Sequence, residues 1–312
     1  MPVIKLSDFI IALDFAGQHI GEFAALLTAV FWTVTSLSFE FASNRVGSLP
    51  VNIIRLVAGF IFLSAFAFIR RGMLLPIDAT SYNWFWLIMS GLVGFVFGDL
   101  FLFKSYTIIG SRFSMLIMNL VPPLTAVAGF LILGERLSVF HFLGMLLTFS
   151  GISLAIFSRK EGGQKISLKL APRGVLYAIG GAVGQALGLV LSKKGMKDYD
   201  PFAATQIRII AGISGYIVLV SILSRWKSIG KATQDKKAIG ATTLGAFFGP
   251  FLGVSFSLIA IKFTATGIAS TIMALVPVFI IVPAVVLFKQ KVTTREIIGA
   301  LISVAGVALF FI

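Results

Sequence analysis

Apolar stretches of about 20 residues recur from one end of this 312-residue chain to the other, separated by short polar breaks. A helix of about 20 apolar residues crosses a bilayer, because the hydrocarbon core is about 30 Å thick. Composition agrees, since 58% of the residues are hydrophobic and only 12% are charged, whereas about a quarter are charged in a soluble domain. The sequence therefore predicts an all-α membrane protein.

Ten transmembrane helices are predicted from stretches bounded by Gly, Pro and charged residues. Residues 1–20 form a short N-terminal segment without the apolar core of a cleaved signal, and an interfacial helix is one interpretation of it. Two basic segments, 158–173 and 225–237, are interpreted as solvated connectors. The ten spans are expected at 21–42, 50–69, 84–103, 113–133, 139–157, 174–192, 201–224, 238–260, 266–288 and 296–312.

The chain contains a long internal repeat. Pro122 and Pro277 lie 155 residues apart (277 − 122), each at the end of a Leu-Val-Pro tripeptide, and Arg55 and Arg208 lie 153 apart (208 − 55). Each half holds five predicted spans, and an odd number makes the second half enter the membrane with opposite polarity. The sequence therefore predicts two inverted five-helix repeats. The first covers 21–157, and the second covers 174–312 after the basic connector 158–173.

Several motifs of the first half resemble the EamA-type repeat of the drug/metabolite transporter superfamily. They are a Gly-rich third span, a fourth span with a central Pro, Gly134-Glu135-Arg136-Leu137 at its end, and Phe97-Gly-Asp-Leu-Phe. The resemblance covers residues 21–312 and implies ten helices and secondary transport, commonly efflux, of metabolites such as amino acids. The second half has Lys289-Gln290-Lys291 in place of Gly134-Glu135-Arg136, so the role of Glu135 is not duplicated.

Charged residues inside spans are costly and suggest function. Arg55, near the start of span two, and Asp99, near the end of span three, are expected at similar depth on one side, where they can pair. Glu40 belongs to the same side and competes for Arg55 or Arg45. Two interpretations stay open, a permanent salt bridge or a carboxylate that exchanges protons during transport. Asp99, Arg55 and Glu40 are therefore candidate coupling or gating residues.

Arg208 lacks the acid that the repeat would provide, because Val254 stands where the first half has Asp99. One interpretation is that its long side chain snorkels to the membrane surface. In the other, Arg208 faces a central cavity and offers, with Gln206 and Gln185, hydrogen-bond donors to an anionic or zwitterionic group. These three are candidate substrate-binding residues.

The prolines of spans four and nine leave backbone carbonyls without their helical partners. Pro122 and Pro277 therefore predict either simple kinks or broken helices that expose polar backbone to the substrate, and both are candidate gating residues. Asn119 adds a polar side chain beside the first break and is a candidate binding residue. Trp32 and Tyr216 are offered as aromatic walls of the site, with helix packing or lipid contact as the alternative.

Signals of enzymatic chemistry are missing. The chain has no GxxxxGK[ST] phosphate loop, and its two histidines, His19 and His141, lack metal-ligand spacing. Cys is absent, which excludes disulfides and thiolate sites. The formal charge of +14 sits in clusters at the ends of apolar segments, which is typical of inner-membrane proteins and not of nucleic-acid binding. No enzyme activity, cofactor or metal is therefore expected.

The orientation of the termini stays open. Eight Lys and Arg fall on the side of the N-terminus and sixteen on the other, with Arg55 and Arg208 inside spans. The positive-inside rule therefore places both termini outside, whereas ten-span relatives are usually thought to have them inside. The partners expected are the bilayer and a small-molecule substrate, with the chain a monomer or homodimer in the inner membrane.

The function predicted is secondary transport of a small metabolite, with a cavity between the two halves. It would be lined by spans three, four, eight and nine with parts of one, two, six and seven. A lipid-handling or flippase-like accessory protein is the alternative, because the same small-residue packing can line a groove that opens to the bilayer. A membrane enzyme ranks third, since no clustered acid, His or nucleophile is visible.

Overall fold

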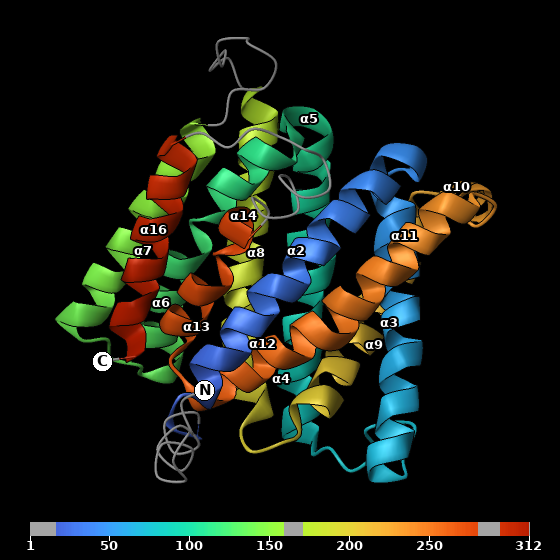
Figure 1. The fold of residues 1–312 in the computed structure, drawn as a ribbon. Coiled ribbons are helices and arrows are strands. Elements are labelled where there is room, and N and C mark those ends of the chain that lie inside the picture. Colours follow the sequence, from blue (N-terminus) through green and yellow to red (C-terminus); the bar gives the residue numbers. More distant parts are fainter. Residues whose placement is uncertain (1–16, 159–170, 280–293, 312) are drawn as a thin grey trace, which may run out of the picture.

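The computed structural model describes residues 17–158, 171–279 and 294–311, and every regular element in these ranges is a helix (Figure 1). The first half contains α2 (Ile20–Val46), α3 (Ser48–Arg71), α4 (Ser81–Gly91), the π-helix η1 (Leu92–Gly98), α5 (Asp99–Met118), α6 (Val121–Leu133) and α7 (Val139–Ser158). The second contains α8 (Pro172–Met196), α9 (Pro201–Ile222), α10 (Trp226–Ala232), α11 (Lys236–Ala246), the π-helix η2 (Phe247–Gly253), α12 (Val254–Phe263), α13 (Thr266–Met273), α14 (Val276–Phe279), α16 (Thr294–Ala308) and the 3-10 turn Leu309–Phe311.

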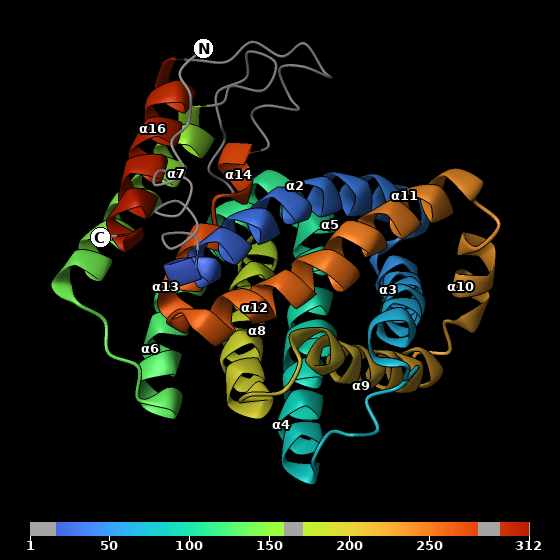
Figure 2. The same ribbon diagram turned by 60° about the horizontal axis from the view of Figure 1, so that its bottom comes forward.

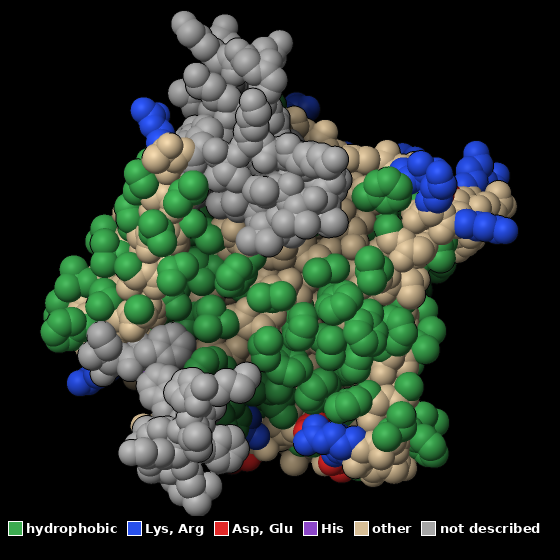
Figure 3. All heavy atoms as spheres, in the orientation of Figure 1, with side chains coloured by type: hydrophobic (Ala, Val, Ile, Leu, Met, Phe, Trp, Pro, Cys, Tyr) green, Lys and Arg blue, Asp and Glu red, His purple; other side chains and the backbone are tan. Residues whose placement is uncertain are grey.

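Within the described residues, six helices are long and apolar enough to cross a membrane, and shorter apolar helices accompany them. Figure 3 shows hydrophobic side chains spread over the middle of one face, with Lys and Arg gathered toward its edges. An apolar middle with charged residues at its edges matches the apolar core and polar surfaces of a bilayer, so this distribution suits a helix bundle surrounded by lipid. The six long spans are Ile20–Val46, Ser48–Arg71, Ser81–Ile109, Pro172–Met196, Pro201–Ile222 and Lys236–Phe263.

The helices of the two halves begin and break at matching positions. The π-helices Leu92–Gly98 and Phe247–Gly253 are offset by 155 residues (247 − 92), and the helices that precede them by the same number (236 − 81). A turn interrupts the next helix at residues 119–120 in one half and at 274–275 in the other. Figure 1 shows α4 and α5 rising from bottom to top, whereas α11 and α12 descend. The sequence repeat is therefore a repeat of local structure.

Small residues bring the helices of the two halves into close contact. A Cβ added to Gly184 of α8 would lie 2.5 Å from the Cα of Gly98, and one added to Gly188 would lie 2.8 Å from that of Gly94. Gly94 and Gly98 therefore serve tight packing of the third span against α8, as expected for helices without apolar burial to drive association. Figures 1 and 2 both show α7 beside α16 at one edge of the bundle, so the last helices of the two halves also pair.

Several predicted boundaries were wrong. The third span continues beyond 84–103 as Ser81–Ile109, so Asp99 lies inside a continuous helix and not near its end. The basic connector 225–237 contains the short helix α10, and most of its residues are exposed. Most of the N-terminal segment 1–20 and of the connector 158–173, and part of span 266–288, lie outside the described residues.

Candidate functional site

A cavity of about 170 Å³ lies between the two halves. Its walls come from α2, α3, η1, α5 and α6 of the first half and from α8, α9, η2, α12, α13 and α14 of the second. Four of the five predicted substrate-binding residues line it: Arg208, Asn119, Gln185 and Trp32. Arg55 and Asp99 line it as well, so the two arginines and the acid of the sequence argument share one space.

Arg55 and Asp99 form a buried ion pair, as the sequence predicted. Nη2 of Arg55 contacts Oδ2 of Asp99, and both side chains are only 6% exposed. Arg55 Nε also donates to Asn52 Oδ1 at 3.0 Å, and Gln185 Nε2 donates to the other Asp99 oxygen, Oδ1, at 2.5 Å. Gln185 belongs to α8, so a carboxylate of the first half is held by both halves.

Aromatic rings enclose the Arg55 guanidinium. Its Cζ lies 5.1 Å from the ring centroid of Phe103, 5.4 Å from that of Phe39 and 5.9 Å from that of Phe95. These distances are within the range of cation–π attraction. The pair therefore sits in an apolar, water-poor environment, where its two charges depend on each other.

Arg208 lines the same cavity and makes no ion pair with the residues that the structure describes. It is 5% exposed, and its Cζ lies 4.7 Å from the ring centroid of Phe95, which Arg55 also approaches. Gly94 leaves the space that the guanidinium occupies, since a Cβ there would lie 3.2 Å from Arg208 Nη2. Arg208 therefore turns into the protein and does not snorkel to the membrane surface.

Asn119 marks a break in the fourth span. α5 ends at Met118 and α6 begins at Val121, so Pro122 stands in the first turn of a new helix, where its missing N–H breaks no bond. The helix is interrupted at residues 119–120, and Leu120 keeps helical dihedrals there, so the kink and the broken helix both stay open as interpretations of the prolines. Asn119 is 2% exposed and lines the cavity, and its Nδ2 has no hydrogen-bond partner in the part of the chain that is described.

The second half breaks in the same place. Residues 274 and 275 form the turn, and α14 begins at Val276, so Pro277 also follows a break directly. Ala274 and Val276 line the cavity, as does Val121 at the matching position of the first half. Both broken spans therefore present their interruptions to the same space.

Two predicted residues do not face the cavity. Gln206 points toward α3, where its Nε2 donates to Ser64 Oγ at 2.9 Å and to the carbonyl of Leu74 at 2.7 Å, so it joins α9 to α3 and the following loop. Tyr216 is fully buried and donates to the carbonyl of Phe95 at 2.9 Å, inside the π-helix η1. A π-helical turn disturbs the regular pairing of backbone carbonyls, and the Tyr216 hydroxyl supplies a donor to one of them. Tyr216 is therefore not the aromatic wall of the site that the sequence suggested.

The remaining candidates have mixed placements. Trp32 lines the cavity from α2 and packs on Gly253 of η2, where an added Cβ would lie 2.7 Å from its Nε1. Glu40 is half-buried on α2 and does not line the cavity. Glu40 was expected to compete for Arg45 or Arg55. Arg45 instead pairs with Asp235 at 2.9 Å, and Arg55 pairs with Asp99.

Comparison with known proteins decides the family. The EamA-like transporter family model matches residues 19–157 and again residues 172–312. The chain belongs to the EamA-like transporter family. It is 28% identical over 238 residues to YyaM, an uncharacterized transporter of Bacillus subtilis, covering 74% of this chain and 72% of the relative. It is 23% identical over 296 residues to human solute carrier family 35 member G1, covering 92% and 77%.

A solved crystal structure has the same fold, with a TM-score of 0.71 over 93% of this chain and 95% of the other, at 19% identity. The family and its apolar helices make this EamA-like protein a multi-pass membrane transporter and not an enzyme. Among the described residues, no group of three or more His, Cys, Asp or Glu could hold a metal ion.

A polar cluster that was not predicted from the sequence lies where the end of α6 meets α8 and α13 of this EamA-like transporter. We call it the clasp: Glu135, Lys193, Thr264 and Thr266. Lys193 Nζ lies 2.7 Å from Glu135 Oε1 and donates to the carbonyl of Thr264 at 2.7 Å. The other Glu135 oxygen, Oε2, accepts from the N–H and hydroxyl of Thr266 at 2.9 and 2.6 Å. The clasp therefore ties the end of α6 to α8 and α13 of the other half.

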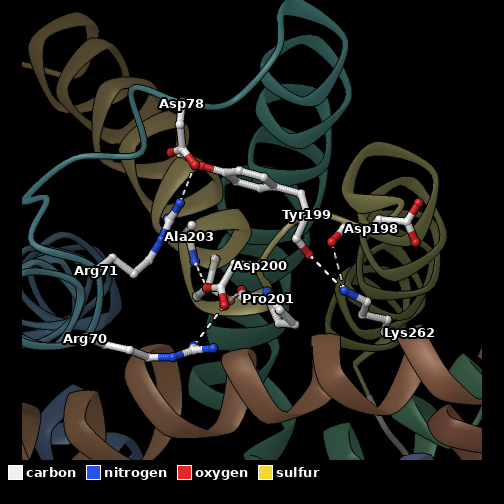
Figure 4. A network of polar contacts seen from close by, with 10 residues as sticks. Arg70, Arg71, Asp78, Asp198, Tyr199, Asp200, Pro201, Ala203 and Lys262 are labelled. Atoms are coloured by element: carbon white, nitrogen blue, oxygen red, sulfur yellow. Dashed lines mark hydrogen bonds and ion pairs between the residues drawn. The ribbon is translucent and has the colours of Figure 1, made fainter.

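Figure 4 shows a second network of polar contacts. Tyr199, in the loop between α8 and α9, donates to Asp78 Oδ1 at 2.8 Å, and Asp78 also contacts Arg71 at the end of α3. Arg70 pairs with Asp200 at 2.8 Å, and Lys262 of α12 donates to the carbonyl of Tyr199 at 3.3 Å. Four loops and helix ends are therefore joined by this network.

The pKa values of this network follow from its contacts. Burial, with the hydrogen bond to the Asp78 carboxylate next in the same direction, raises the pKa of Tyr199 to about 12 against the opposing effect of Arg71. Burial alone would raise the pKa of Asp78, but the hydrogen bond from Tyr199 and the charge of Arg71 bring it below its ordinary value. Asp78 is therefore held as an anion and Tyr199 as a proton donor at neutral pH.

One signal for the clasp was visible in the sequence. Glu135 stood out as an acid that the second half does not repeat, and Lys193 stood where the first half has Glu40. Their sequence separation of 58 residues (193 − 135) gave no reason to pair them. The contact depends on how α8 packs against the end of α6, which is a tertiary property.

Proposed function

We propose that this EamA-like protein is a secondary transporter that moves a small metabolite, an amino acid or related compound, out of the cell across the inner membrane. The observation that carries the proposal is a cavity with paired and unpaired charges, placed between two structural repeats at the level of their helix breaks. Transporters built from repeats commonly bind substrate at such a position, near the bilayer midplane.

Alternating access would follow from an inverted relation of the two halves. Support comes from the opposite courses of α4–α5 and α11–α12 in Figure 1 and from the shared positions of their breaks. In this arrangement we take the clasp to be the contact that seals one face. The ten-helix count and the export direction come from the family resemblance.

Asp99 is the candidate for coupling to protons. Its charge is favoured by Arg55 and by the Gln185 donor, whereas burial in an apolar surrounding favours the neutral acid. Gln185 lies on α8 of the other half, so a motion between the halves changes the contacts of the carboxylate. A carboxylate that loses partners in one state takes up a proton there, and this links the proton to the transport cycle.

The experiment uses the purified chain in liposomes. A thermal-shift screen of amino acids and other small metabolites selects a compound, and its flux is measured with and without a pH gradient. Asp99→Asn should lose the response to the pH gradient and keep exchange of the compound at equal pH, since Asn preserves shape and fixes a neutral group. Asp200→Asn is the matched control, since Asp200 forms a partly exposed ion pair with Arg70 at the protein surface, and it should keep the response.

Two results would count against the proposal. If no water-soluble metabolite shifts the melting temperature and only lipids do, the chain is a lipid-handling protein. If Asp99→Asn responds to the pH gradient as the unaltered chain does, Asp99 has no coupling role.

A further inference from the structure

Arg208 is a buried cation whose hydrogen-bonding capacity is unused. It is 5% exposed, and it makes no hydrogen bond or ion pair with any residue that the structure describes, apart from its contact with the Phe95 ring. Its Nε is fully enclosed without an acceptor. A buried guanidinium carries five N–H groups and is costly when none is satisfied. The acceptors must come from water or from a bound molecule in the cavity that Arg208 lines.

The charges around the cavity do not balance. Its lining holds two guanidinium groups, Arg55 and Arg208, and one carboxylate, Asp99. Asp99 pairs with Arg55 and accepts from Gln185, and its charge also acts on Arg208. Among the described residues of the lining, one carboxylate therefore faces two guanidinium groups, which leaves one positive charge in excess. Glu40 of α2 follows the lining residues Ser36 and Phe39 closely in sequence, but it is not part of the lining.

Asn119 provides a second, independent sign of a missing acceptor. Its Nδ2 is enclosed and has no partner in the described residues, and its side chain lines the same cavity from the break in the fourth span. Arg208 belongs to the second half and Asn119 to the first. An anion held by both would contact the two repeats together, as Asp99 does through Arg55 and Gln185.

The rest of the lining is mostly apolar. Phe95, Trp32, Leu189, Met273 and Val276 form walls without charge, and hydroxyl groups such as Ser257 and Ser270 lie among them. An apolar wall with a few convergent donors is typical of sites for amphipathic small molecules. It does not suit a multiply charged ligand, because each further charge would enter an apolar surrounding without a partner.

We propose that the cavity binds a small amphipathic monocarboxylate, with its carboxylate held by Arg208 and Asn119 and its apolar part against Phe95, Trp32 and Met273. This rests on the proposed function, since the bound compound is taken to be the transported one, and it narrows the substrate from an amino acid or related compound to a carboxylate without the ammonium group. A single negative charge balances Arg208. A zwitterion leaves the positive charge uncompensated, because its ammonium finds no free carboxylate in the lining.

The test compares four probes that share a phenyl group: 3-phenylpropionate, phenylalanine, 2-phenylethylamine and phenyl phosphate. Binding to the full chain in detergent is measured by titration calorimetry and by thermal shift at neutral pH. 3-Phenylpropionate should bind most tightly, phenylalanine less tightly, and the amine not at all. Phenyl phosphate, as a dianion, should bind more weakly than the monocarboxylate.

Arg208→Gln should weaken 3-phenylpropionate binding at least about tenfold, the effect of losing one charge-assisted hydrogen bond. Arg208→Lys should recover part of the loss, since it restores the charge without the planar fork. Without ligand, Arg208→Gln should be as stable as the unaltered chain or more stable, because it removes an unsatisfied buried charge. If Arg208 instead stabilised the fold, Arg208→Gln would be less stable than the unaltered chain. Arg70→Gln, which alters an exposed cation at the protein surface, should leave binding unchanged.

The possible results separate this proposal from the proposed function. Absence of binding by either carboxylate at millimolar concentration, or unchanged affinity in Arg208→Gln, overturns the anion site and leaves transport open. Equal affinity for phenylalanine and 3-phenylpropionate overturns the charge-balance argument. Arg208-dependent carboxylate binding without flux in liposomes supports the site and contradicts the transport proposal.

Discussion

The buried pair of Arg55 and Asp99 allows the energy of a membrane-embedded ion pair to be measured inside one protein. The perturbation is a double-mutant cycle of Asp99→Asn, Arg55→Met and the double variant. Asn keeps the oxygen that accepts from Gln185, and Met keeps an apolar stem among the surrounding rings. The cycle therefore removes the charges with little change of shape.

The magnitude follows from burial and from the contacts that remain. Both side chains are 6% exposed, and removing one partner of a buried pair costs about 3–5 kcal/mol because the other charge stays uncompensated. Arg55 would still donate to Asn52 and contact three rings, which places Asp99→Asn at the lower end, about 3 kcal/mol. The double variant should be less destabilised than the sum of the single variants, with a coupling energy of about 2–3 kcal/mol.

The assay is reversible unfolding in mixed micelles, followed by tryptophan fluorescence as the SDS fraction rises. Arg70 and Asp200 supply the matched control, since they form the same type of pair at 2.8 Å with side chains 51% and 18% exposed. Their coupling energy should stay below about 1 kcal/mol, because solvent screens the charges. Asp200→Asn keeps a side chain able to cap α9, so the control does not confound the helix start.

A coupling energy for Arg55 and Asp99 no larger than that of the surface pair would refute the reasoning. It would mean that water reaches the pair freely in the folded protein. A double variant more stable than the unaltered chain would instead show that desolvation outweighs the attraction, as it does in some buried pairs.

Two further predictions concern the clasp and the network that Figure 4 shows. The chain has no cysteine, so a single cysteine placed at Ser257 reports access to the cavity. Glu135→Gln and Lys193→Gln should each increase its modification by a membrane-impermeant maleimide added from the clasp side. Equal labelling in all forms would contradict a sealing role for the clasp. The lowered pKa of Asp78 means that its pair with Arg71 stabilises the fold above the ordinary carboxylate pKa and is lost as pH falls. The difference in melting temperature between the unaltered chain and Asp78→Asn should therefore shrink between pH 6 and pH 3, and a constant difference would contradict this.

Several features followed from sequence alone because they depend on local or periodic properties. Long apolar stretches indicate helices in lipid whatever their neighbours are. The offset of 155 residues predicted matching structure in both halves, and Pro122 and Pro277 located a break that the structure shows at both places. Arg55 and Asp99 were paired correctly because a buried charge in a membrane span needs an opposite charge and the neighbouring spans offer few.

The direction in which each polar side chain points was decided by tertiary structure. Gln185 and Gln206 are the same residue type in neighbouring spans, yet only Gln185 faces the cavity. In a soluble protein an apolar stripe would show which side of a helix is buried. Here lipid and protein interior are both apolar, so helix rotation leaves little trace in the sequence. The same holds for Lys193, whose contact with Glu135 exists because packed helices bring distant residues together.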